Sequence, residues 1–84
     1  MHESGIVKGI LKKVIAEAQS NQAKKVLKIK LKAGSFEMLT SEHLQYHFSL
    51  LSKGSIAEDA LIELEEFPGS GITIEAIELE GNEK

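Results

Sequence analysis

KVLKIKLKAG, residues 25–34, is the stretch that decides the fold of this 84-residue chain. From Leu27 to Ala33 apolar residues alternate with lysines, which is the pattern of a strand with one buried face. Gly34 closes this strand, and we expect it to permit a turn conformation that other residues resist. Two more strands are predicted over residues 60–67 and 72–80, where acidic residues alternate with apolar ones.

Two helices are predicted around these strands. The first carries apolar residues at helical spacing, and Ser4 is expected to cap its start. The second runs from Thr40 or Ser41, either of which can be its N-cap, to Leu51. Each strand has only one apolar face, so both helices should cover the same face. The sequence therefore predicts an α/β (α+β) fold of order α-β-α-β-β, with two helices on one face of a three-stranded mixed sheet.

The order of the strands stays open at this stage. Glutamates on the second and third strands could pair with Lys28, Lys30 and Lys32, which favours the lysine strand in the middle. The short turn Pro68-Gly69-Ser70-Gly71 instead favours a hairpin of the last two strands. Exchange of the last strand between two protomers would resolve the conflict between these two arguments, and it would give a homodimer.

The apolar pattern of the last strand changes phase. Ile72, Ile74 and Ala76 keep one register, whereas Ile77 and Leu79 keep the other. A slip of one residue reverses the faces of a strand, so a β-bulge is predicted near Glu75 or Ala76.

Composition excludes several classes of function. The chain has no cysteine, which excludes disulfides, thiolate zinc sites and cysteine nucleophiles. It has a net charge of −3 and no arginine, so nucleic acid is not an expected partner. No apolar run is long enough for a membrane span and no signal peptide precedes the domain, so we expect a cytoplasmic protein. No catalytic constellation is present, and we do not expect an enzyme.

The start Met1-His2-Glu3 is the candidate metal site. An α-amine, a backbone amide and an imidazole lie within two residues, and such nitrogen donors suit Ni(II) or Cu(II). The competing interpretation is a chain terminus that happens to carry a histidine. His43 and His47 lie one helical turn apart and could share a metal, but a surface pair without a native metal is the simpler interpretation.

Four segments in this order resemble the HypA family, the nickel metallochaperones of [NiFe]-hydrogenase maturation, some of which also serve urease. They are MHESGIVKGILKKVIAEAQ, KVLKIKLKAG, SEHLQYHFSLLSKGSIAEDALIELEEFP and ITIEAIELE. The resemblance implies a Ni(II) site formed by the Met1 amine, the His2 imidazole and amide, and the Glu3 amide. It also implies a HypB-like GTPase and the hydrogenase large subunit as partners.

The chain departs from the family where HypA proteins carry a zinc-ribbon lobe with two CxxC pairs. Here the linker Gly69-Ser70-Gly71 joins the flanking strands directly. We therefore interpret residues 1–84 as a single nickel-binding domain from which the zinc lobe was excised, and we expect no zinc. A natural short homologue is the alternative origin. The alternative function is a metal-free protein-interaction or assembly domain, with a strand-swapped dimer as one form.

Overall fold

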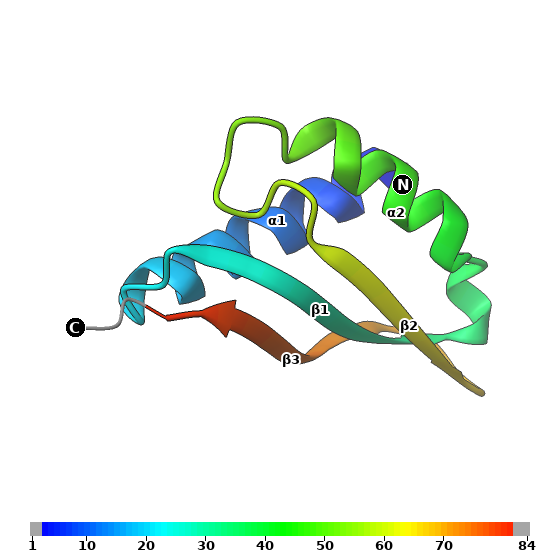
Figure 1. Ribbon diagram of the computed structural model, residues 1–84. Helices are drawn as coiled ribbons and strands as arrows, with labels where there is room; N and C mark the ends of the chain where they lie inside the picture. Colours follow the sequence, from blue (N-terminus) through cyan, green and yellow to red (C-terminus); the bar gives the residue numbers. More distant parts are fainter. Residues whose placement is uncertain (1–2, 82–84) are drawn as a thin grey trace.

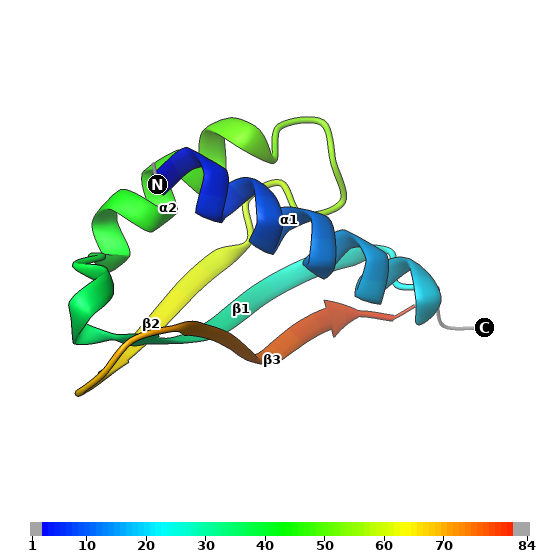
Figure 2. The same ribbon diagram turned by 180° about the vertical axis from the view of Figure 1, so that it is seen from behind.

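Two helices cover one side of a three-stranded sheet (Figures 1 and 2). The computed structural model describes residues 3–81, with side chains from residue 5 onward. The predicted fold class and element order are confirmed. In chain order the elements are α1 (Glu3–Ser20), β1 (Lys25–Gly34), the short 3-10 helix η1 (Ser35–Glu37), α2 (Ser41–Leu51), β2 (Leu61–Phe67) and β3 (Ile72–Glu80).

The starts of the two helices differ in how well the sequence predicts them. Thr40 is the N-cap of α2, and its side-chain oxygen accepts a hydrogen bond of 3.2 Å from the His43 backbone N–H. The expectation that Ser4 caps the first helix is wrong, because α1 already begins at Glu3 and includes Ser4.

The lysine strand β1 lies in the middle of the sheet, in the order β2-β1-β3. It pairs parallel with β2 and antiparallel with β3, so of the arrangements that the sequence left open the hairpin of the last two strands is excluded. The Lys28 ammonium lies 3.1 Å from the Glu63 carboxylate on β2 and 3.9 Å from the Glu78 carboxylate on β3. The observed order is therefore the one that charge pairing across strands favoured.

The linker between β2 and β3 crosses the end of β1 at Gly34. The Gly34 N–H donates a 2.8 Å hydrogen bond to the Gly71 carbonyl, and the Phe36 N–H donates one of 2.9 Å to the Gly69 carbonyl. Gly34 has φ −71° and ψ 149°, which any residue adopts, so the expected turn conformation is wrong. Glycine is needed here because a Cβ would overlap the backbone of Gly69 and Ser70.

Two β-bulges set which side chains enter the core. Lys30 pairs with Ala76 and Leu31 with Ile74, so Glu75 is the extra residue of β3 and the predicted bulge is confirmed. A second irregularity lies at Leu27. Val26 pairs with Leu79 and Lys28 with Glu78, so Leu27 is an extra residue of β1. Leu27 is 43% exposed, which corrects the prediction that it belongs to the buried face.

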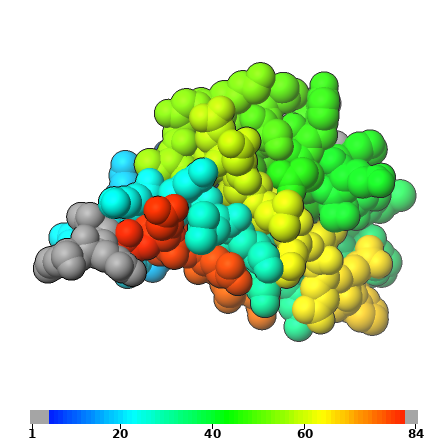
Figure 3. Space-filling model, viewed as in Figure 1, coloured from blue at the N-terminus to red at the C-terminus, as the bar shows by residue number. Residues whose placement is uncertain are grey.

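The core lies between the sheet and both helices. Its largest fully buried apolar side chains come from α1, β1 and α2: Val7, Val14, Val26, Ile29, Leu31, Leu44 and Phe48. In Figure 3, α2 and the loop after it cover the upper part of the molecule, and the strands are visible below them. The other face of the sheet carries the lysines and glutamates that the alternation predicts.

Candidate metal centre

The predicted metal motif adjoins the first residue of α1. Met1 and His2 lie outside the described residues, whereas Glu3 begins the helix. Both ribbon views place the start of α1 beside the middle of α2, and the two helices are in contact (Figures 1 and 2). Val7 and Val14 are fully buried, so the apolar face of α1 anchors the helix that follows the motif.

Within residues 3–81, no three histidine, cysteine, aspartate or glutamate side chains are grouped so that they could hold a metal ion. Met1 and His2, the first two residues of the predicted ligand set, lie outside this range. The assignment of Met1, His2 and Glu3 as metal ligands therefore stays a prediction.

The other candidate, the histidine pair of α2, is described. His43 is exposed and His47 is half-buried, and both lie on the helix that packs beside α1. The Tyr46 and His47 rings meet edge to face, with centroids 5.4 Å apart and an angle of 74° between their planes. The structure thus places an exposed and a half-buried imidazole one helical turn apart on α2.

Gln45 is a structurally important residue that sequence reasoning missed. Its Oε1 accepts a 2.8 Å hydrogen bond from the Ile62 N–H, and its Nε2 donates one of 3.1 Å to the Ala60 carbonyl. These two bonds tie α2 to the outer edge of β2. A glutamine at helical spacing gives no sequence signal for this role, because its partners are backbone groups that lie 15 and 17 residues away.

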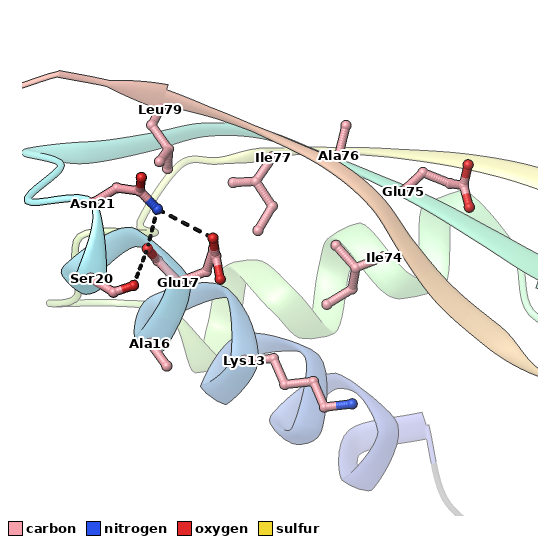
Figure 4. A pocket seen from close by; sticks show the side chains of 10 residues that line it. All are labelled: Lys13, Ala16, Glu17, Ser20, Asn21, Ile74, Glu75, Ala76, Ile77 and Leu79. Carbon is pink, nitrogen blue, oxygen red and sulfur yellow. Dashed lines mark hydrogen bonds between the residues drawn. The ribbon is translucent and has the colours of Figure 1, made fainter.

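A groove runs between α1 and β3 (Figure 4). Figure 4 shows Ile74, Ile77 and Leu79 pointing from β3 toward α1. At one end Asn21 Nδ2 donates hydrogen bonds of 2.9 Å to the Glu17 carbonyl and 3.2 Å to its carboxylate. These contacts close the last turn of α1. The groove is mainly aliphatic, and its residues do not form the nucleophile and base pair of a catalytic site.

The clearest electrostatic feature lies on the open face of the sheet. The hydrogen bond that the Lys28 ammonium donates to the Glu63 carboxylate, and the charges of Glu63 and Glu78, raise the pKa of Lys28 above its ordinary value. Lys28 lies on the central strand β1 and thereby links it to both edge strands, β2 and β3. This site is a structural ion pair and resembles no metal or catalytic centre.

Comparison with known proteins identifies a family. A family model described as "Hydrogenase/urease nickel incorporation, metallochaperone, hypA" matches residues 1–73. The hydrogenase maturation factor HypA of Methanobrevibacter smithii is 38% identical over 68 residues, which are 81% of this chain and 54% of the relative. HypA of Archaeoglobus fulgidus is 38% identical over 64 residues, which are 76% of this chain and 58% of the relative.

The chain spans little more than half the length of these two relatives. A solved structure supports the fold independently. The solution structure of the Ni metallochaperone HypA from Helicobacter pylori matches with a TM-score of 0.80 and 14% sequence identity, covering 98% of this chain and 100% of that one. No helix of residues 3–81 has the length and hydropathy that crossing a membrane requires.

Proposed function

Because this chain belongs to the HypA family of nickel-incorporation metallochaperones, we propose that it binds Ni(II) at its N-terminus and delivers it during [NiFe]-hydrogenase maturation. Urease is the alternative destination that the family description includes. The observation that carries the proposal is that the family match begins at residue 1 and so includes the motif. Metallochaperones of this family are not enzymes, in agreement with the prediction of a non-catalytic chain.

The proposed ligands are the Met1 amine, the His2 imidazole and amide, and the Glu3 amide. Nitrogen donors of this kind suit Ni(II) in a tetragonal arrangement. The start of α1 supports this set, because the first four N–H groups of a helix have no partner within the helix. Glu3 is the first residue of α1, so using its amide as a ligand breaks no bond of the helical ladder.

We further propose that residues 1–84 are a nickel-binding domain without the zinc-ribbon lobe. The chain contains no cysteine, and the linker Gly69-Ser70-Gly71 stands near the end of the family match. A HypB-like GTPase and the hydrogenase large subunit are the proposed partners. Any contact that needs the zinc lobe is outside this proposal.

Nickel titration of the untagged chain tests the proposal. We expect one tight equivalent of Ni(II) in the wild type and its loss in His2→Ala, measured by calorimetry at neutral pH. A circular dichroism spectrum checks that the variant keeps its fold. Unchanged stoichiometry and affinity in His2→Ala would refute the proposed site. A chain that binds no Ni(II) at all would instead favour the metal-free interaction domain.

A further inference from the structure

The described part of the chain holds a second group of potential nickel ligands on α2, the helix beside α1. His43 and His47 are four residues apart on α2, so they lie on one face about 6 Å apart along the helix axis. Two imidazoles at this spacing can bind one metal ion together, as the two histidines of HExxH helices do.

The rotation of α2 shows which way this pair faces. Gln45 lies on the side of α2 that contacts β2, because its side chain bonds to the backbone of Ala60 and Ile62. Two residues turn a helix by about 200°, so His43 and His47 lie on the opposite side from Gln45. The flank of α2 that carries the pair is therefore turned away from β2.

The helix α1 lies beside α2. The helix α2 packs on β2, at one edge of the sheet, whereas α1 packs on β1 and β3. The two helices also contact each other, and the start of α1 lies beside the middle of α2 (Figures 1 and 2). The pair therefore lies on a helix that contacts α1.

The surroundings leave the pair accessible to an ion from solvent. His43 is exposed, His47 is half-buried, and the Tyr46 side chain next to them is 62% exposed. The edge-to-face contact between Tyr46 and His47 restricts the orientation of that imidazole. A ligand whose orientation is already restricted loses less conformational freedom when the metal binds.

We propose that His43 and His47 together bind one Ni(II) ion, with water in the remaining coordination positions, as a second and weaker metal site. Neutral imidazole is a common ligand of such ions. Two imidazoles supply fewer protein donors than the amine, amide and imidazole set of the N-terminal motif. Such a site can take up an ion and release it toward the N-terminal motif. Its role in delivery rests on the proposed function, whereas its existence does not.

Titration of the untagged full chain with Ni(II) alone tests this second site. We expect a tight equivalent and a weaker second equivalent by calorimetry. His43→Ala/His47→Ala should lose only the weaker one, and His2→Ala should lose only the tight one. In wild-type NMR spectra, the imidazole resonances of His43 and His47 should broaden as the second equivalent of paramagnetic nickel binds.

The double variant His47→Leu/Leu50→His is the matched control. It keeps the composition and the number of imidazoles but separates them by seven residues, about 10 Å along the axis, which is too far for one ion. We expect it to lose the second equivalent as well. The proposal is wrong if the second equivalent survives in either double variant, if the wild type shows none, or if removing the pair abolishes the tight equivalent. His2→Ala that keeps the tight equivalent overturns the proposed function and leaves this inference standing.

Discussion

The backbone of Gly69 lies directly over Gly34, and no side chain fits between them. This contact allows four residues, Pro68 to Gly71, to carry the chain from β2 across the end of the central strand to β3. The Glu37 carboxylate supports the crossing by accepting a 2.6 Å hydrogen bond from the Gly71 N–H. The short linker therefore joins two strands that are not neighbours.

Gly34→Ala should destabilise the fold because its Cβ must displace the backbone of the linker. Inserting atoms into a closely packed site typically costs about 1–3 kcal/mol, so we expect a loss of this size in the free energy of unfolding. Urea denaturation measures the loss. Sedimentation of the same variant should show more dimer, because exchange of β3 between two chains relieves the overlap.

Gly9→Ala is the matched control for that experiment. Gly9 lies inside α1 and a Cβ there meets nothing within 4 Å. Alanine is favoured over glycine in a helix by about 0.5–1 kcal/mol, so this variant should be more stable than the wild type. A Gly34→Ala chain as stable as the wild type would show that the linker does not pass over this residue.

Because of the ion pairs of Lys28, the stability of the fold should vary with pH in the alkaline range. Its pKa is raised in the folded chain, so its ion pairs stabilise the fold below the ordinary lysine pKa of 10.5. That contribution is lost as the pH rises through the higher folded pKa. The difference in unfolding free energy between wild type and Lys28→Met should therefore shrink above about pH 10.5.

Lys30→Met is the control for this pH dependence. Lys30 lies on the same strand, and the ion pairs found among residues 3–81 involve Lys28 alone. Its loss should leave the alkaline part of the stability curve close to that of the wild type. If the two variants had the same pH dependence, the pairs of Lys28 would not be the cause.

Gln45→Ala should weaken the attachment of α2 to the edge of β2. The variant removes both hydrogen bonds to the backbone of Ala60 and Ile62 and leaves the Ile62 N–H, in a residue only 7% exposed, without its acceptor. An unsatisfied buried group costs about 1–3 kcal/mol, which is the expected loss by urea denaturation. Ser49→Ala, one turn further along the same flank, is the control. It removes only an exposed hydrogen bond to Gln45, so it should lower the free energy of unfolding by less than about 0.5 kcal/mol.

One residue added before Met1 should abolish tight nickel binding without unfolding the chain. The addition converts the Met1 amine into an amide while His2 and Glu3 remain, so it removes one donor of the proposed set. The expected loss is the tight Ni(II) equivalent by calorimetry. An extended chain that keeps full affinity would show that the free amine is not a ligand.

Local pattern was enough to predict most of the elements of this fold. The alternation of lysine with apolar residues in β1, the phase change at Glu75 and the cap at Thr40 each depend on residues close together in sequence. Such patterns can be recognised in the sequence alone because side-chain direction and backbone hydrogen bonding repeat with the period of the helix or strand. The candidate motif Met1-His2-Glu3 was also visible at this level.

Contacts between distant segments decided the rest. The sequence suggests that Gly34 is a turn residue, whereas the structure shows that the linker crosses it. Gln45 likewise looks like an ordinary helix position in the sequence, whereas the structure shows that its side chain bonds to β2. Leu27 fits the buried pattern of its strand, yet a bulge turns it outward. The sequence alone determined the elements, the shared apolar face and the family, because these follow from local periodicity and residue order. Only the tertiary structure decided why β1 needs a glycine at its end and which flank of α2 carries the histidines, because both depend on the packing of segments that are distant in the chain.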